Sequence, residues 1–291
     1  MIQSIWKEII AMNINYKWGF YIDNRLVLID AQLNTDVEYY KKLRQALKIE
    51  NLKDNLLVRV GTHLTDGSYV MVDSFKKSRI AYSFGISNDV SWDNAMVNKG
   101  FEVYMYDHTI NDIPYYVDGF HFFKEGISGN NKAEEHLNTL ETYIKRNGHT
   151  TKTNMVLKMD VEGAEWDFLE TVPVKILKQF DQIVLEFHNL VRACSDEEKE
   201  RRIAALHKLN ATHQLVHLHG NNTGYVLQFL GATFPDVIEV TYANRKHYKT
   251  LPAKEIIVPS EIDIVNDRNR EDLFLGNWNR PLSENLFEVE F

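Results

Sequence analysis

The chain has 291 residues, of which 44% are hydrophobic and 25% are charged, as in an ordinary globular protein. Its formal net charge of −8 disfavours non-specific binding to nucleic acid, because neutralising phosphates requires clustered Lys and Arg. The single cysteine, Cys194, excludes an intramolecular disulfide and any metal site built from several cysteines.

Two features of the sequence bear on its cellular location. No apolar run reaches the roughly 20 residues that a membrane-spanning helix needs. The N-terminus carries an acidic residue early and lacks the basic stretch of a secretory signal. The sequence therefore predicts a cytoplasmic protein without a membrane span.

The first 55 residues are predicted to form an N-terminal appendage. Residues 1–12 favour a short helix, and residues 17–30 have two apolar runs around a turn, which is typical of a β-hairpin. Residues 36–49 have apolar positions at helical spacing, which indicates an amphipathic helix. This appendage, residues 1–55, is a candidate surface for homo-oligomerisation.

From residue 56 onward, strand-like and helical patterns alternate. The strand-like segments are 56–60, 69–75, 79–86, 101–107, 119–129, 154–163, 180–190, 213–222 and 236–245. The helical segments are 90–100, 134–148, 164–172 and 196–210. This alternation predicts an α/β domain over 56–248, with a mostly parallel sheet covered on both faces. The last two strands lack a helix between them and predict an antiparallel pair at the sheet edge, and residues 249–291 are expected to pack on the domain as a tail.

Polar groups beside small residues follow most of the predicted strands, where ligands of such sheets bind. Gly85 ends one strand and Asp107 the next, near the spacing at which an acid meets a ribose in dinucleotide folds. The rest of the phosphate-binding glycine motif is missing, and Asp89 would repel a pyrophosphate. These residues favour a ligand with a cationic amino-acid end, such as S-adenosylmethionine. Alternatively, Gly85 only relieves crowding between a strand and a helix.

A second motif, KMDVEGAEWDFLE at 158–170, places Asp160 and Glu162 at a strand end, followed by Gly163 and a helix. Acidic residues in the first turn of a helix are favoured by its dipole, which explains Glu165 and Asp167 as a good helix start. It does not explain Asp160, which follows a largely apolar strand. Asp160 is therefore predicted to face the ligand crevice.

This motif resembles the signature of the FkbM-type methyltransferases, which are class I S-adenosylmethionine-dependent enzymes. Further segments resemble the family or one of its branches, so that the resemblance covers roughly residues 56–248; they are 58–73, 82–110, 217–222 and 235–245. The resemblance implies a seven-stranded Rossmann-like fold and methyl transfer to oxygen, often on sugars. Ser87 departs from the family pattern, because a second glycine is common at its position.

On this resemblance, one set of residues is predicted to bind the cofactor: Tyr69, Ser83, Phe84, Gly85, Asn88, Asp107, His108, Glu125, Gly126, Ile127 and Asp160. Within this set, the loop after Gly85 would line the methionine end and Asp107 would bind the ribose. The segment 125–127 would face the adenine. Arg59, Asp66, Gly67 and Tyr69 would close over the cofactor.

Four residues are predicted to carry the chemistry. His188 or His219 would take the acceptor's proton, with the charge of the histidine set by Asp160 or Glu186. Alternatively, each histidine is a hydrogen-bonded structural residue. A further alternative is a divalent metal ion held by Asp160, Glu186 and a histidine, which the sequence allows but does not require.

The sequence thus predicts an S-adenosylmethionine-dependent O-methyltransferase that acts on a small polar acceptor, a sugar or sugar nucleotide of surface-glycan biosynthesis. One alternative is a non-catalytic binding module with the same fold. Another is methylation of a protein or a different metabolite. A nicotinamide-dependent sugar oxidoreductase is disfavoured by the missing phosphate loop.

Overall fold

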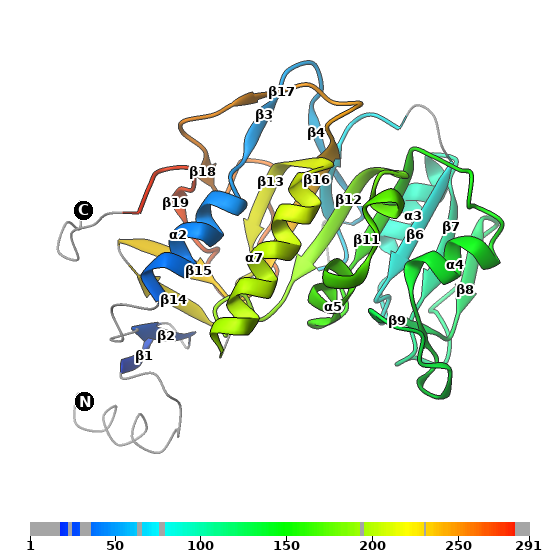
Figure 1. The fold of residues 1–291 in the computed structure, drawn as a ribbon, viewed down its shortest axis with the longest axis horizontal. Helices are drawn as coiled ribbons and strands as arrows, with labels where there is room; N and C mark the ends of the chain where they lie inside the picture. The colour runs from blue at the N-terminus through cyan, green and yellow to red at the C-terminus, as the bar shows by residue number, and fades with distance from the viewer. Residues whose placement is uncertain are drawn as a thin grey trace.

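A computed structural model describes most of the chain (Figure 1). It covers residues 18–22, 25–29, 36–62, 66–75, 79–192, 195–229 and 231–282. The predicted helix at 1–12 and Cys194 lie outside these residues. No helix in the described segments combines the length and the hydrophobicity that a bilayer crossing requires.

A seven-stranded sheet forms the centre of the molecule, with the order β8-β7-β6-β11-β12-β16-β13. Its strands are β6 (Ile80–Phe84), β7 (Glu102–Tyr106), β8 (Phe120–Phe123), β11 (Met155–Met159), β12 (Phe180–Phe187), β13 (His213–Gly220) and β16 (Ile238–Asn244). All pairs are parallel except those of β16, which is antiparallel to both neighbours. This is the seven-stranded Rossmann-like arrangement that the sequence predicts. The predicted sheet and its antiparallel edge pair are confirmed, and the reversed strand lies one position in from the edge.

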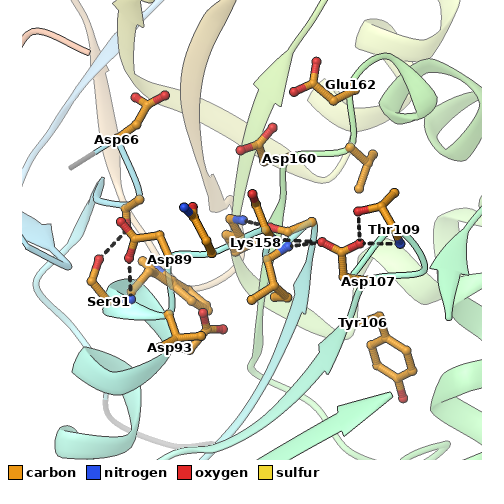
Figure 2. Close-up of a pocket in the computed structure, with 18 of the residues that line it drawn as sticks. Asp66, Asp89, Ser91, Asp93, Tyr106, Asp107, Thr109, Lys158, Asp160 and Glu162 are labelled. Atoms are coloured by element: carbon orange, nitrogen blue, oxygen red, sulfur yellow. Dashed lines mark hydrogen bonds between the residues drawn. The ribbon is translucent and has the colours of Figure 1, made fainter. Parts of the chain in front are cut away.

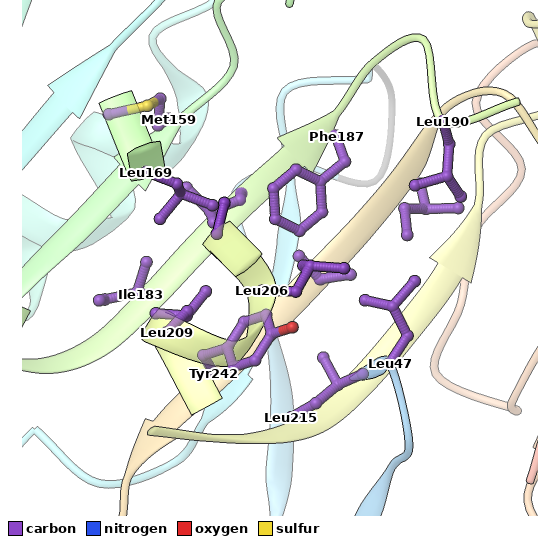
Figure 3. Close-up of a cluster of buried hydrophobic side chains, with 14 of the residues drawn as sticks. Leu47, Met159, Leu169, Ile183, Phe187, Leu190, Leu206, Leu209, Leu215 and Tyr242 are labelled. Atoms are coloured by element: carbon purple, nitrogen blue, oxygen red, sulfur yellow. The ribbon is translucent and has the colours of Figure 1, made fainter. Parts of the chain in front are cut away.

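Alternating side chains of the buried strands supply one hydrophobic core on each face of the sheet. One core lies under α3 (Ser91–Asn98) and the hairpin of β4 (Leu57–Val60) and β5 (Tyr69–Val72). The other lies under α2 (Asp36–Ala46), α4 (Leu140–Arg146), α5 (Ala164–Thr171), α6 (Val174–Leu177) and α7 (Asp196–Asn210). In Figure 3, Leu206 and Leu209 of α7 lie over Ile183 of β12, and Tyr242 of β16 joins the same cluster.

The described segments nearest to the two ends of the chain pair with other parts of the molecule. A second sheet has the order β1-β2-β14-β15, in which β2 pairs in parallel with β14. Its strands are β1 (Trp18–Ile22), β2 (Arg25–Ile29), β14 (Val226–Phe229) and β15 (Ala232–Pro235). Four short strands form two further pairs: β3 (Glu50–Leu52) with β17 (Thr250–Pro252), and β18 (Ile257–Val258) with β19 (Gly276–Asn277). The described part of the N-terminal segment thus packs against the domain, and the oligomerisation assigned to residues 1–55 stays a prediction.

Two departures from the predicted elements change the architecture. The helix expected at 134–148 begins only at Leu140, because Thr139 caps it by accepting a hydrogen bond from the Thr142 N–H at 3.3 Å. Before it lie β9 (Gly126–Ile127), a 3₁₀ turn at Ala133–Glu135 and β10 (Leu137–Asn138). The hairpin of β14 and β15 was not predicted, and it carries the second sheet.

Lowering the pH should destabilise the protein through His213. This side chain is fully buried, and its Nε2 lies 3.1 Å from the Phe180 carbonyl oxygen. Burial lowers the pKa of His213 from 6.5 to about 4, so only the unfolded chain binds a proton between these values. Stability should therefore fall as the pH drops from 6.5 towards 4, by on the order of 3 kcal/mol.

Urea unfolding of the wild type and of a His213→Gln variant at several pH values checks this prediction. Other groups titrate in the same range, so the relevant quantity is the difference between the two proteins. That difference should change in favour of the variant as the pH falls. Parallel curves would contradict the assignment.

Candidate functional site at the switch in strand order

A cleft of about 680 Å³ opens at the carboxyl ends of β6, β7 and β11 (Figure 2). The chain proceeds from β6 to β7 and β8 on one side and then returns to β11 on the other side of β6. The strand order therefore reverses between β6 and β11, the place where open α/β sheets bind their ligands. The cleft has the volume of a small-molecule site.

Gly85 allows the loop after β6 to pass close to the backbone of Asp160. Its backbone has φ +75°, and a Cβ atom built on it would lie 1.5 Å from the carbonyl oxygen of Asp160. Only glycine fits such an approach. Ser87, two residues further on, has φ +51°. The position at which the FkbM-type pattern favours glycine is thus left-handed here too, and a serine occupies it.

Asp107 fixes this loop from the neighbouring strand. Its Oδ2 accepts hydrogen bonds from the N–H groups of Ile86 at 2.9 Å and Ser87 at 2.8 Å. Its Oδ1 accepts from the N–H of Thr109 at 2.8 Å and from the hydroxyl of Thr109 at 2.6 Å. Burial alone would raise the pKa of Asp107, but these hydrogen bonds lower it below its usual value. The carboxylate is thus an anchor for the loop that forms the cleft wall.

The buried ammonium group of Lys158 lines the cleft. The Lys158 ammonium donates to the carbonyl oxygens of Gly85 and, at 3.4 Å, of Phe84. Asp93 of α3 is also buried and lines the cleft. Burial raises the pKa of Asp93 to about 6, although nearby Lys158 acts in the opposite direction.

Acidic groups dominate the charge of the cleft. Six carboxylates line it: Asp66, Asp89, Asp93, Asp107, Asp160 and Glu162. Among the described lining residues, Lys158 is the only Lys or Arg. A net cationic ligand is attracted to such a site, whereas a pyrophosphate lying against Asp89 in the loop after Gly85 would be repelled.

His188 follows β12 and lies between acidic side chains at one side of the cleft. Its Nδ1 is 2.9 Å from Oε1 of Glu165. Its Nε2 faces three other carboxylates, Glu162 at 3.5 Å, Glu186 at 3.7 Å and Asp160 at 3.8 Å. Burial lowers the pKa of His188, but the bond to Glu165 and the surrounding acids raise it to about 8 overall.

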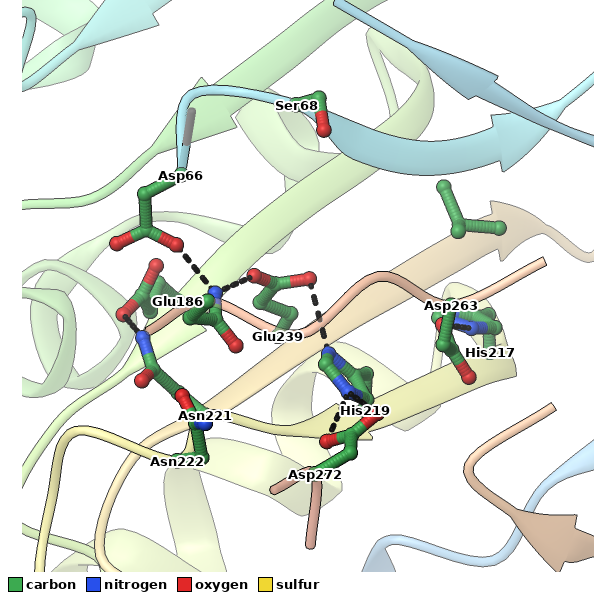
Figure 4. Close-up of polar contacts among 12 residues, drawn as sticks. Asp66, Ser68, Glu186, His217, His219, Asn221, Asn222, Glu239, Asp263 and Asp272 are labelled. Carbon is green, nitrogen blue, oxygen red and sulfur yellow. Dashed lines mark hydrogen bonds and ion pairs between the residues drawn. The ribbon is translucent and has the colours of Figure 1, made fainter. Parts of the chain in front are cut away.

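Beyond His188, a second polar cluster lies under the C-terminal tail (Figure 4). Its buried carboxylate Glu186 accepts from the Asn221 amide at 2.9 Å. Asn266 of the tail donates to Asp66 and, at 2.6 Å, to Glu239. Burial and the charge of Asp160 hold the pKa of Glu186 well above its usual value. The tail thus covers the carboxyl ends of β12 and β13.

His219 belongs to this covered cluster. It is fully buried, its Nε2 lies 3.0 Å from Oδ1 of Asp272, and its Nδ1 lies 3.6 Å from Oε2 of Glu239. Burial opposes protonation, but these two acids raise the pKa of His219 to about 10. A histidine that is protonated at neutral pH is a poor base. The sequence left His219 as either a base or a hydrogen-bonded structural residue, and these contacts favour the structural role.

Most of the predicted cofactor residues converge on the cleft. They are Tyr69, Gly85, Asn88, Asp107, His108, Gly126, Ile127 and Asp160. Three predicted residues do not line it. Ser83 and Phe84 are fully buried within β6, where Phe84 stacks on Tyr106, and Glu125 is turned towards Arg146 at 2.8 Å. Burial inside the sheet places Ser83 and Phe84 away from the cavity, and the ion pair with Arg146 does so for Glu125.

The residues predicted to close over the cofactor divide in the same way. Asp66, Gly67 and Tyr69 line the cleft, and the Tyr69 hydroxyl donates to Asp160 at 3.1 Å. Arg59 instead donates to the Ser68 carbonyl at 2.9 Å and to the Ile262 carbonyl of the tail at 3.0 Å. It ties the tail to the loop before β5 rather than contacting a ligand.

Sequence reasoning missed three buried residues of the site: Asp93, Lys158 and Glu165. Lys158 carried a signal, because a charged residue stands inside the otherwise apolar strand MVLKM. Asp93 and Glu165 stand in the first turns of α3 and α5, where an acid is expected for helix stability alone.

Comparison with known proteins gives little further information. No family model matches the chain, and no curated protein matches its sequence. A solved structure of M. jannaschii TYW2 in complex with AdoMet is similar over 78% of this chain and 85% of that chain, with 12% identity and a TM-score of 0.25. A likeness at this level does not establish a relationship, so the fold assignment depends on the strand order.

Proposed function

We propose that the cleft binds S-adenosylmethionine and that the protein transfers its methyl group to a hydroxyl of a small polar acceptor, a sugar or sugar nucleotide. The observation that carries the proposal is a carboxylate-lined cleft at the switch in strand order. The donor has a sulfonium and an ammonium group against one carboxylate, so it is a net cation that suits this cleft. The resemblance to FkbM-type enzymes supports the choice of an oxygen acceptor and of a sugar.

The site residues divide along the bound donor in this proposal. Gly126 and Ile127 would border the adenine. Asp107 would hold the loop that faces the ribose, and Gly85 would bring that loop onto Asp160 at the methionine end. The acceptor would lie on the side of Glu162 and His188, next to the transferred methyl group.

The proposed reaction is a direct displacement at the methyl carbon. A bond forms between the acceptor oxygen and this carbon, the bond from carbon to sulfur breaks, and its electron pair stays on the sulfur. The proton of the acceptor hydroxyl passes to a water molecule in the same process. The sulfonium is already a strong electrophile, so the protein contributes mainly by aligning oxygen, carbon and sulfur.

Calorimetric titration with S-adenosylmethionine and S-adenosylhomocysteine tests the donor. Because the product has lost the positive charge of the sulfonium, the acidic cleft should bind the donor more tightly. The ratio of the two affinities should shrink as salt rises from about 0.05 M to about 0.5 M, since salt screens the carboxylates. NADH fluorescence should be unchanged by the protein. If neither ligand binds at concentrations up to about 1 mM, the proposal is overturned, because any remaining affinity would be very weak.

The acceptor is sought by incubating the protein with S-adenosylmethionine and a panel of sugar nucleotides. Mass spectrometry should detect a gain of about 14 Da, the mass of one CH₂, on one of them, together with S-adenosylhomocysteine. Donor binding without turnover on any sugar, protein or other metabolite would instead support the non-catalytic binding module.

A further inference from the structure

We propose that Asp160, Glu162, Glu186 and His188 bind a divalent metal ion at the edge of the cleft, with Glu165 orienting the histidine. These residues come from the adjacent parallel strands β11 and β12 and from the start of α5. Their presence on neighbouring strand ends brings donors from separate parts of the chain to one point.

The spacing around Nε2 of His188 is that of ligands rather than of hydrogen-bond partners. The three facing carboxylate oxygens lie 3.5, 3.7 and 3.8 Å away. Donors bound to one ion at about 2.1 Å stand roughly 3.0 to 3.5 Å apart. All three oxygens are too far for a good hydrogen bond to Nε2 and within a few tenths of an ångström of the separation of two ligands on one ion. Small movements of these side chains towards a common point would form the proposed coordination shell.

Glu165 supplies the orientation that a histidine ligand needs. Its side chain is fully buried. Its Oε1 lies 2.9 Å from Nδ1 of His188 and accepts a hydrogen bond from the Val161 N–H at 3.0 Å. A proton held on Nδ1 leaves the lone pair of Nε2 directed at the other carboxylates. This carboxylate–histidine arrangement is the usual support of a metal-binding histidine.

A second observation at Glu165 points to an ion. Its Oε2 is buried and has no hydrogen-bond partner among the described residues. One donor atom from each of Asp160, Glu165 and His188 lies within 4.8 Å of the other two, so the Glu165 carboxylate belongs to the same cluster. A buried carboxylate oxygen without a donor is costly unless a cation is close.

The donor set selects the class of metal. One imidazole and several carboxylate oxygens suit Mn²⁺ or Mg²⁺, and no sulfur donor is among these residues. The ion would lie beside Asp160, which lines the cleft. There it would bind the acceptor hydroxyl and lower its pKa, so that His188 acts as a ligand rather than as the base. This last role rests on the proposed methyl transfer, whereas ion binding itself does not.

Titration of Mn²⁺ into protein freed of metal by a chelator, followed by the paramagnetic resonance signal of free Mn²⁺, tests the site. We expect one ion per chain. His188→Ala and Glu186→Gln should weaken Mn²⁺ binding about 100-fold or more, and Glu165→Gln about 10- to 100-fold, as for other residues that orient ligands. Asp167→Asn, on the same helix but outside the cluster, should bind like the wild type. Thermal melts confirm that each variant is folded.

The same samples are titrated with S-adenosylhomocysteine, so that the metal site and the donor site are tested independently. Mn²⁺ binding that depends on these residues, without S-adenosylhomocysteine binding, supports the metal site and overturns the donor site. S-adenosylhomocysteine binding without Mn²⁺ binding overturns the metal site alone. Mn²⁺ binding that is equal in the wild type and in folded His188→Ala and Glu186→Gln variants also overturns it.

Discussion

A Gly85→Ala variant is expected to lose S-adenosylhomocysteine binding by at least about 100-fold. The added Cβ would lie 1.5 Å from the Asp160 carbonyl oxygen, and the backbone φ of +75° disfavours any side chain. The loop after β6 must therefore move away from Asp160. Both walls of the cleft shift, because this loop carries the Gly85 carbonyl that accepts from Lys158 of β11 and the N–H groups that Asp107 binds.

Gly148→Ala is a matched control for this variant. Gly148 also has φ +75°, but a Cβ built there has no heavy atom within 4 Å. Both variants carry the same left-handed backbone strain, which costs about 1 kcal/mol, and only Gly85→Ala adds the collision. Calorimetry should show normal binding by Gly148→Ala. Equal binding by the two variants would mean that the contact of Gly85 with Asp160 does not shape the cofactor site.

The strand ends that carry the site could be predicted from the sequence, because they follow from a simple pattern. Gly85, Asp107 and Asp160 each stand where an apolar strand stops, and parallel strands bring such positions to one edge. Ser83 and Phe84 are the last two residues of β6 and stand directly before Gly85. The sequence does not reveal that this small offset places them inside β6, fully buried.

The surroundings of the two candidate histidines depend on contacts between distant parts of the chain. His219 contacts Asp272, which stands 53 residues later in the chain, in the C-terminal tail. The tail has no periodic pattern that predicts its path. Glu165 is directed at His188 by the angle between α5 and β12. Local periodicity predicts that both elements exist, but it does not predict how they pack. The same limit explains why the buried pair of Lys158 and Asp93 was missed.

Replacing Asp107 with asparagine should weaken S-adenosylhomocysteine binding by about 30-fold or more and also destabilise the protein. The carboxylate accepts from two N–H groups on Oδ2 and from Thr109 on Oδ1. An amide has only one acceptor oxygen, so its NH₂ must face donors on one side. Hydrogen bonds to a charged group contribute about 1.5 to 3 kcal/mol each, and the loop from Gly85 to Asn88 should become mobile when a pair is lost.

Asp89→Asn separates this effect from the general loss of negative charge in the cleft. The Asp89 side chain accepts from the Ser91 N–H at 2.7 Å, and asparagine makes the same bond equally well. Asp89→Asn should therefore keep its stability and lose affinity mainly for the cationic donor, by a factor that salt suppresses. Asp107→Asn should lose affinity for donor and product alike, at all salt concentrations, because the loop itself is displaced. If the two variants behave alike in urea unfolding and in both titrations, Asp107 contributes charge alone, and its role as the anchor of the cofactor loop is wrong.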